Sequence, residues 1–329
     1  MNEKIVVIGS NSISGSAFVQ YALEKGAHVT GISRSQEPAD VFLPYKWSDH
    51  NKFSFHQLDL NHDLDAILDL VRSGHPDYIV NFSAQSMVAQ SWSHPEHWFM
   101  TNVVSTIKLH DCLRQCSFLK KYVHVSTPEV YGNCDGYVKE NTSYHPSTPY
   151  AVSRAAADMS LHTFFKSYQF PVAFTRAANV YGPGQQLYRI IPRTILFIKL
   201  GKKLQLHGGG VSERSFIHIR DVADATYRIA REAPCGEIYH IATQRTITVR
   251  GLVEMICHKM GVAFEDHVEI SGERMGKDAA YFLDSSKIRE TLKWEDKVSL
   301  EEGIDNVIDW TEKNFEELQK QPLEYIHKP

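Results

Sequence analysis

The chain has 329 residues, of which 35 are basic and 39 acidic, and its formal net charge is −4 at pH 7. It is 43% hydrophobic and 22% charged, a globular composition with room for one large α/β domain or two smaller ones. The slight acidic excess argues against a nucleic-acid binder, and no apolar run reaches the roughly 18 residues of a membrane span.

The start of the chain leads directly into a strand, so we expect no signal peptide. The five cysteines are interpreted as reduced thiols, and together these features predict a cytoplasmic protein. The 17 histidines are scattered. They form no HExxH pair, and no cluster of two histidines with a carboxylate stands out, so no metal site is expected.

The first predicted elements are a buried strand over residues 4–8 and an amphipathic helix from about Gly15 to Lys25. The turn between them has Gly9 and Gly15 at the ends of a dinucleotide-binding motif, but Ser12 replaces its middle glycine. Gly9 would permit the tight turn, and Gly15 would permit close packing of helix on strand. The N–H groups at the start of the helix are then available to a pyrophosphate.

The second strand is predicted over residues 28–32, and its carboxyl end decides the expected cofactor. An acidic residue usually stands there to bind the adenosine ribose. Here Ser33 and Arg34 follow the strand, without a carboxylate. This pattern favours a 2′-phosphate, and therefore NADP, with NAD as the alternative. Arg34 would otherwise stack on adenine or face solvent.

A third strand (53–58) and a fourth (78–82) flank a predicted helix at 65–72. Asp59, at the end of the third strand, would meet the adenine amino group or cap the next helix. Small residues follow the fourth strand at 83–86 and would allow close approach of a cofactor. A helix around residues 99–113 is predicted next.

The chain then reaches the stretch with the clearest chemistry. A short buried strand at 122–125 ends just before Ser126, Thr127 and Glu129. Ligands bind at this edge of open α/β sheets, so a hydroxyl and a carboxylate there suggest proton transfer.

A later Ala-rich helix opens with Tyr150 and carries Arg154 one turn on, on the same face. A guanidinium beside a phenol favours the phenolate, which would make the tyrosine a better base. The alternative is that both are ordinary helix residues and that Glu129 is a solvated carboxylate.

Strands and helices alternate up to a strand at 171–176, which predicts a doubly wound parallel sheet (Rossmann). We expect a dinucleotide-binding domain over residues 1–176. Residues 177–329 are expected to form mainly a smaller C-terminal substrate-binding domain, with segments returning to the first. The tail after Trp310 is expected to be helical and peripheral. Four arginines would clamp a diphosphate or lie on the surface, namely Arg189, Arg193, Arg214 and Arg274.

With these residues in place, the chain resembles the extended short-chain dehydrogenases/reductases, and among them the nucleotide-sugar 4,6-dehydratases acting on dTDP-glucose or GDP-mannose. The resemblance covers nearly the whole chain. Its second half is similar to the pyrimidine-nucleotide members, and the Arg34 region to the guanine-nucleotide members that use NADP. The matching segments are residues 9–15, 81–86, 126–132, 150–154, 179–183, 214–216 and 274–278.

The resemblance implies a mechanism. Tyr150 would remove the C4 hydroxyl proton as hydride leaves, with Thr127 or Ser126 hydrogen-bonded to that hydroxyl. Glu129 would then abstract the C5 proton, water would leave from C6, and the hydride would return to C6. The product would be a 4-keto-6-deoxy sugar nucleotide.

The resemblance also implies binding roles for two further sets of residues. The expected cofactor contacts are Gly9, Ser12, Ile13, Gly15, Ser33, Arg34, Asp59, Leu60, Ser83, Ala84 and Asn102. The expected substrate contacts are Gln85, Ser86, Asn179, Arg214 and Arg274. A homodimer that pairs helices 99–114 and 150–167 is expected as well.

Three positions depart from the family pattern. Arg154 stands where the family has lysine, and the exchange is not conservative. Pro128 replaces the acid that protonates the leaving hydroxyl in dTDP-glucose dehydratases, although GDP-mannose dehydratases also lack it. Ser12 interrupts the glycine turn. These departures keep open an epimerase, a C4 dehydrogenase or a 5,6-dehydratase on the same scaffold, and a weakly catalytic protein that binds a nucleotide sugar or dinucleotide.

Overall fold

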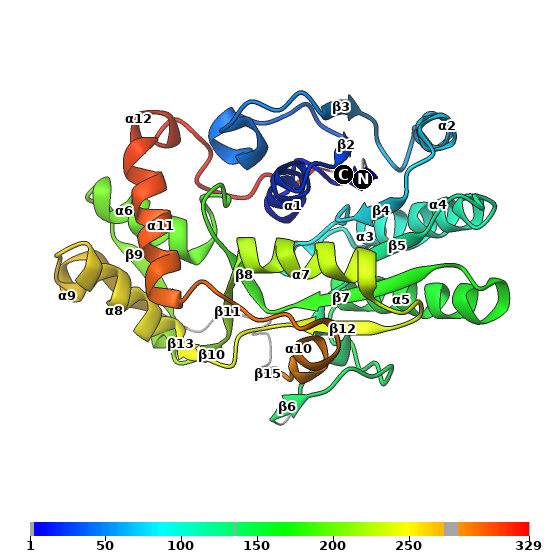
Figure 1. Cartoon of the computed structure of the whole chain (residues 1–329). Helices are drawn as coiled ribbons and strands as arrows, with labels where there is room; N and C mark the ends of the chain where they lie inside the picture. The colour runs from blue at the N-terminus through cyan, green and yellow to red at the C-terminus, as the bar shows by residue number, and fades with distance from the viewer. Residues whose placement is uncertain (1–2, 135, 273–281, 329) are drawn as a thin grey trace.

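The computed structural model describes residues 3–134, 136–272 and 282–328. Its centre is a seven-stranded sheet in the order β12-β7-β5-β4-β1-β2-β3, with helices on both faces (Figure 1). All neighbouring strands run parallel, so the predicted doubly wound fold is confirmed. The strands are β1 (Lys4–Ile8), β2 (His28–Ser33), β3 (Phe53–Gln57), β4 (Tyr78–Asn81), β5 (Lys121–Val125), β7 (Val172–Ala177) and β12 (Ile238–Ile241).

Helices alternate with these strands and continue into the C-terminal part. The helix expected around residues 99–113 differs from the prediction, because it begins at Pro95 and passes through a π-helical segment, η4 (Met100–Ser105). Proline suits a first helical position, where its missing N–H is not needed. The α-helices are α1 (Ile13–Glu24), α2 (Leu64–Gly74), α3 (Pro95–Phe99), α4 (Thr106–Leu113), α5 (Pro149–Tyr168), α6 (Ile190–Lys199), α7 (Ile219–Glu232), α8 (Val249–Lys259), α9 (Phe264–His267), α10 (Ser286–Leu292), α11 (Leu300–Lys313) and α12 (Phe315–Leu318).

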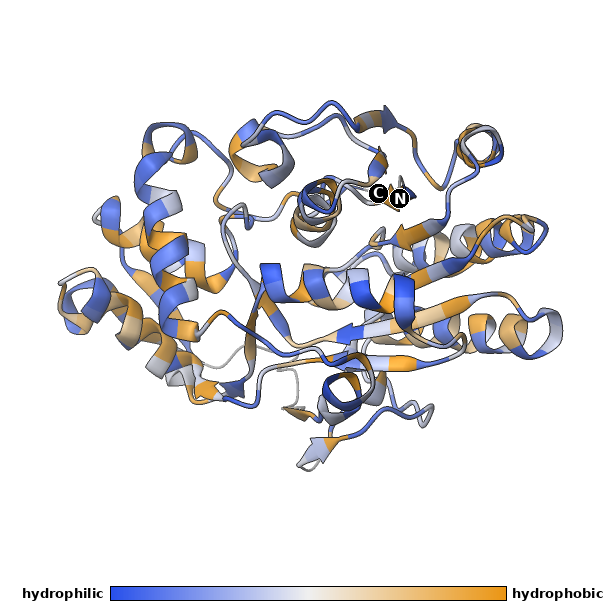
Figure 2. Cartoon of the chain, in the orientation of Figure 1, coloured by the Kyte–Doolittle hydropathy of each residue, from blue (hydrophilic) through white to orange (hydrophobic). Residues whose placement is uncertain are grey.

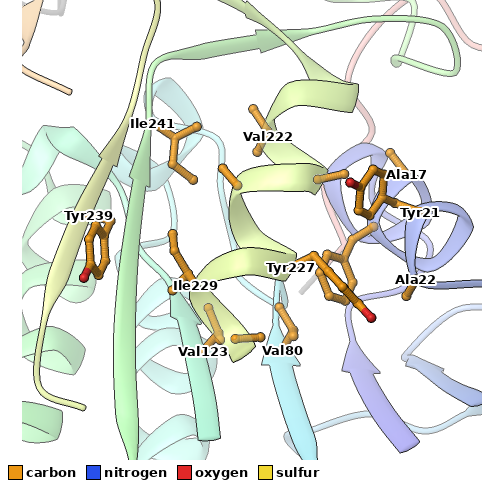
Figure 3. Close-up of a cluster of buried hydrophobic side chains, with 14 of the residues drawn as sticks. Ala17, Tyr21, Ala22, Val80, Val123, Val222, Tyr227, Ile229, Tyr239 and Ile241 are labelled. Atoms are coloured by element: carbon orange, nitrogen blue, oxygen red, sulfur yellow. The ribbon is translucent and has the colours of Figure 1, made fainter. Parts of the chain in front are cut away.

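Alternation along the strands separates two cores, one on each face of the sheet. In β1, Ile5 and Val7 pack with α1 and α7, whereas Val6 and Ile8 pack with α2, α4 and α5. Figure 2 shows hydrophobic residues on the central strands and on the helix sides that cover them. Figure 3 shows the first core, in which Tyr227 of α7 lies against α1.

The register of the sheet brings the carboxyl ends of four strands together. Ile8 of β1 pairs with Asn81 of β4, and Asn81 pairs in turn with His124 of β5. Val125 then pairs with Thr175 of β7. The segments that leave these strands therefore open at one edge, next to the point where the chain reverses its direction of winding around β1.

The C-terminal part contains short pairs of strands and two further cores. Segments also return to the large sheet, because β12 pairs with β7 and α7 and α10 pack in the first core. The boundary at residue 176 stays a prediction. The short pairs are β6 (Tyr137–Val138) with β15 (Phe282–Leu283), β8 (Asn179–Tyr181) with β11 (Phe216–His218), β9 (Leu204–His207) with β14 (Val268–Ser271), and β10 (Glu213–Arg214) with β13 (Ile247–Thr248).

The end of the chain differs from the expected peripheral helix. After α12, residues 319–328 are not helical. They run back along the molecule (Figure 1), and the carbonyl of Lys328 accepts hydrogen bonds from Arg34, just after β2, and from Gln85, after β4. Among the described residues, no helix is long and apolar enough to span a membrane.

Candidate active site

A cleft of about 1190 Å³ opens at the carboxyl edge of the sheet. Its lining joins the start of α1, the loops after β4 and β5, and one face of α5. The far side comes from the C-terminal part of the chain, including α6 and β9. A cleft of this kind, at the switch point of a parallel sheet, is where α/β proteins bind ligands.

The turn after β1 has the form that a dinucleotide needs. Gly9 has φ +87°, and a Cβ there would lie 2.7 Å from the backbone nitrogen of Ser83. A Cβ on Gly15 would lie 2.1 Å from the carbonyl oxygen of Gly9. Both positions therefore require glycine, as the sequence predicted.

Ser12 does not disrupt this turn, because its φ of −74° suits any residue. Its Oγ accepts a hydrogen bond from the N–H of Gly15 (3.0 Å) and donates one to the carbonyl oxygen of Gly9 (2.8 Å). Ser12 is thus the N-cap of α1, and the helix begins at Ile13 rather than at Gly15. Ser12 and Ile13 both line the cleft.

The end of β2 lies beside this turn. The hydroxyl of Ser33 accepts a hydrogen bond from the N–H of Asn11 (3.0 Å) and is buried. The guanidinium of Arg34 donates from Nη2 to the carbonyl oxygen of Lys328 (3.1 Å). Ser33 therefore supports the turn, while Arg34 is held at the edge by the C-terminal segment.

Asp59 has a local role. Its Oδ1 accepts from the N–H of Asn61 (2.8 Å), and the N-cap of α2 is Asp63. The alternative that Asp59 caps the next helix is therefore wrong. Leu60 is buried in the core behind the turn.

The loop after β4 is held from behind by Asn102. Its amide accepts from the N–H of Gln85 (2.8 Å) and donates to the carbonyl oxygen of Gln85 (3.0 Å) and to Ser153 Oγ (2.9 Å). Asn102 is fully buried, so it positions the loop rather than facing the cleft. The Oγ of Ser83 donates a hydrogen bond to Asn81 Oδ1 (2.6 Å), whereas Ala84 lines the cleft.

The loop after β5 presents the expected catalytic groups. Thr127 is the N-cap of the 3₁₀ helix η5 (Pro128–Tyr131), and its Oγ1 accepts from the N–H of Glu129 (3.3 Å). Pro128 occupies the first position of this helix, where it loses no hydrogen bond. Thr127, Glu129 and Tyr150 all line the cleft.

The electrostatics of Tyr150 correct one expectation. Burial and the charge of Glu129 raise the pKa of Tyr150 to about 12. Arg154, a hydrogen bond with Thr127 and the charge of Arg189 act in the opposite direction. The charge of Arg154 therefore lowers the pKa of Tyr150, as predicted. Burial and the neighbouring carboxylate raise the pKa by more than Arg154 lowers it. Thr127, Glu129, Tyr150 and Arg189 all line the same cleft.

The hydroxyl of Ser126 is hydrogen-bonded to a buried carboxylate beside the cleft. It donates to Asp158 Oδ2 (2.7 Å), which also accepts from Arg176 Nη2 (2.8 Å), while the other oxygen, Asp158 Oδ1, lies 3.4 Å from His124 Nε2. Asp158 is fully buried. Ser126 also lines the cleft, so the choice between Thr127 and Ser126 as the partner of the substrate hydroxyl stays a prediction.

Arg154 belongs partly to the same buried cluster. It is 2% exposed and reaches the cleft, but its Nη2 donates to the carbonyl oxygen of Val125 and contacts His124 Nε2 (3.3 Å). Burial and the charge of Arg154 hold the pKa of His124 well below its usual range. The sequence analysis missed Asp158, although Tyr150, Arg154 and Asp158 follow one another at four-residue spacing on a single helix face.

Three of the expected substrate residues, Ser86, Asn179 and Arg214, line the cleft. Gln85 is instead buried beneath the C-terminal segment and donates to the carbonyl oxygen of Lys328 (2.7 Å). Arg274 lies outside the described residues.

The two other arginines considered for a diphosphate clamp, Arg189 and Arg193, also line the cleft. Glu324 and Tyr325, which sequence analysis did not single out, complete this side. Glu324 pairs with Arg193 at 2.6 Å, so the end of the chain forms part of the site wall.

Comparison with known proteins identifies the family. The family model described as GDP-mannose 4,6 dehydratase matches residues 6–307. A dTDP-glucose 4,6-dehydratase of Neisseria gonorrhoeae is 29% identical, over 94% of this chain and 95% of that protein. A trifunctional UDP-glucose 4,6-dehydratase/epimerase/reductase of Arabidopsis thaliana is 31% identical over 80% of this chain. The chain spans 40% of the length of that relative.

Among solved structures, the dTDP-glucose 4,6-dehydratase DesIV of Streptomyces venezuelae, with NAD and TYD bound, has a TM-score of 0.86. It is 28% identical, over 94% of this chain and 97% of that one. With the glycine turn, the cleft and the Tyr150 face in place, the chain belongs to the GDP-mannose 4,6 dehydratase family of extended short-chain dehydrogenases/reductases.

Proposed function

We propose that the protein is a nucleotide-sugar 4,6-dehydratase, which converts an NDP-hexose to the 4-keto-6-deoxy sugar nucleotide. The observation that carries this proposal is the position of Glu129 beside Tyr150 in one cleft, close enough for its charge to raise the pKa of the phenol. An epimerase or dehydrogenase acting at C4 needs no base for the C5 proton, whereas a dehydratase does.

The residues suit a bound nicotinamide dinucleotide at the other end of the cleft. Gly9 and Gly15 let the turn pack closely against the neighbouring backbone, and the N-terminal N–H groups of α1 would be available to a pyrophosphate at this turn. When bound, the dinucleotide supplies the hydride acceptor for C4 and the hydride donor for C6. Relatives of this fold hold NAD. The sequence Ser33-Arg34-Ser35 at the end of β2 contains no acidic residue, which favours NADP for this chain, with NAD as the alternative.

The chain's own residues then divide the proton transfers. Tyr150 accepts the C4 hydroxyl proton, and Thr127 orients that hydroxyl through a hydrogen bond. Glu129 removes the C5 proton, which the neighbouring ketone makes acidic. Pro128 cannot donate a proton, so the proton held by Glu129 is available to the departing C6 hydroxyl, and water leaves.

On the substrate side, Arg189 and Arg214 line the cleft and supply positive charge for the diphosphate of a nucleotide sugar. Asn179 is fixed by donation from Nδ2 to the carbonyl oxygen of Ser215 (3.1 Å). Asn179 lines the cleft, where it could contact the same substrate. We favour a pyrimidine nucleotide, from the resemblance of the C-terminal half.

The test is incubation of the purified protein with UDP-, dTDP-, GDP- and CDP-hexoses in deuterium oxide. The bound cofactor is first released from one sample by denaturation and identified by mass. The products of the incubations are then identified by mass and proton NMR. Loss of water with deuterium at C5 is the expected result and names the nucleotide. An isomer of unchanged mass would replace the proposal with an epimerase. No turnover despite a bound dinucleotide would indicate a binding protein.

We also propose that the active protein is a homodimer through α3, η4 and α5. The exposed large hydrophobic residues of these elements are Phe99, Met100, Val104, Val152, Met159 and Tyr168. By contrast Leu109, Ala155 and Ala157 of the same helical region are buried in the chain's own core. Replacing Val104 or Met159 by arginine should give a monomer in size-exclusion chromatography with light scattering, while arginine at the exposed Val211 of the C-terminal part should not. A variant that stays dimeric would place the interface elsewhere.

A further inference from the structure

Away from the catalytic groups, His94, Glu96 and His97 gather at the start of α3. His94 Nδ1 lies 3.6 Å from Glu96 Oε1, and His97 Nε2 lies 3.7 Å from the same oxygen. All three atoms lie within 4.8 Å of one another. The spacing of two and one residues matches no familiar metal motif, so the cluster is not evident from the sequence.

These separations suit a small divalent cation. Zinc binds imidazole nitrogen and carboxylate oxygen at about 2.0–2.2 Å in tetrahedral sites. Ligand atoms at such distances are separated from one another by roughly 3.3–3.6 Å. The two measured separations to Glu96 are within a few tenths of an ångström of that range. His94 and Glu96 are exposed and His97 is half-buried, so solvent can reach the cluster.

A fourth residue supports the cluster from the far end of the chain. His97 Nδ1 lies 2.9 Å from His327 Nε2, so the second ring nitrogen of His97 is hydrogen-bonded. His327 is itself held by stacking on the buried ring of Trp98, with centroids 5.1 Å apart. A hydrogen bond to the second nitrogen is the usual means by which a metal-binding histidine is oriented.

We propose that His94, Glu96 and His97 bind a zinc ion, with water at the open position, and that His327 orients His97. When His97 donates its Nδ1–H to His327, its Nε2 lone pair faces the centre of the cluster. The rings of His94, His97 and His327 are stacked nearly parallel, at centroid distances of 5.2–5.9 Å. One divalent cation satisfies the imidazole nitrogens and the carboxylate at once.

The consequence is that the metal would fasten the C-terminal segment. The neighbouring Lys328 carbonyl accepts from Gln85 Nε2 and Arg34 Nη2, and Glu324 pairs with Arg193. This segment therefore crosses from the substrate side of the cleft to the end of β2. If the proposed function holds, zinc would slow exchange of a dinucleotide at that edge. Zinc binding itself does not depend on that function.

The first experiment measures zinc binding directly, without substrate. The purified protein is stripped with a chelator, and zinc affinity is measured by competition with a chromophoric chelator at pH 7.5. We expect one tight site, weakened at least tenfold in His94→Ala and in His97→Ala. His258→Ala, which removes an exposed histidine of α8, is the matched control and should bind as the parent does. Affinity unchanged in both cluster variants would overturn the proposal.

Two further readouts separate ligands from the orienting residue. Cobalt in place of zinc should give the visible absorption bands of a tetrahedral site, and these should disappear in Glu96→Gln. For His327→Ala we expect affinity to fall by about 10- to 100-fold with the bands retained, since the ligands remain. Zinc should also slow amide hydrogen exchange in residues 324–328 of the parent protein. Absence of both the bands and the protection would refute the site, whatever the enzyme assay shows.

Discussion

Replacing Glu129 by glutamine should separate the two halves of the proposed reaction. The carboxylate is the base for the C5 proton, so elimination should slow by about 10²- to 10⁴-fold. The same carboxylate is the second largest influence that raises the pKa of Tyr150 to about 12. Neutralising it lowers that pKa, and oxidation at C4 should therefore be retained and extend to lower pH.

The size of the second effect follows from the position of Tyr150. With a pKa of about 12, roughly one phenol in 10⁴ is ionised at pH 8. Deprotonation of Tyr150 at that pH therefore costs about 5 kcal/mol of free energy. Each unit by which the pKa falls would raise the phenolate fraction tenfold at that pH. The rate of C4 oxidation should rise accordingly, until another step limits it.

The assay is a single turnover of the nucleotide sugar that proves to be the substrate. In the Glu129→Gln variant the absorbance of reduced nicotinamide should appear and persist, because no alkene forms to accept the hydride. Deuterium uptake at C5 should be lost in parallel. Glu213→Gln, at an exposed carboxylate of β10, is the control and should behave as the parent. Equal slowing of oxidation and elimination would refute the role given to Glu129.

Three further changes test the surroundings of the site. Arg154→Lys should retain activity, since lysine keeps the charge and can reach one buried acceptor; an inactive variant would mean that the guanidinium fork is needed. Asp158→Asn should cost about 3–5 kcal/mol in urea unfolding, because it leaves the fully buried Arg176 without its counter-charge; a loss below 1 kcal/mol would contradict this. Burial lowers the pKa of His110 and of His240 to about 3, so the unfolded chain binds protons first. Stability should be greatest above pH 6.5 and decrease as the pH falls toward 3, measured as the free energy of unfolding; a flat profile would refute the reasoning.

The outline of the fold followed from local patterns. Apolar runs such as 4–8 and 78–82 mark strands that are buried on both faces, and turns with glycine or small residues mark their ends. Because parallel strands point the same way, residues after these runs meet at one edge without knowledge of any long-range contact. This is why the turn at Gly9 and the positions of Thr127 and Tyr150 could be predicted together.

Other features depended on contacts between distant segments. The pKa of Tyr150 is set by how deeply α5 is buried and by the loop that carries Glu129, neither of which the spacing to Arg154 reveals. Asp158 finds Arg176 and Ser126 only after three separate elements pack together. Local periodicity contains no information about such partners.

The sequence by itself determined the doubly wound sheet, the glycine turn and the face shared by Tyr150 and Arg154, because each is encoded within a few neighbouring residues. Tertiary structure alone decided the path of residues 319–328, which lack an apolar period and are positioned by Arg193, Gln85 and Trp98. It also decided the meeting of His327 with His97, 230 residues away in the chain. Pairings over such distances arise when whole surfaces pack, so composition and spacing do not specify them.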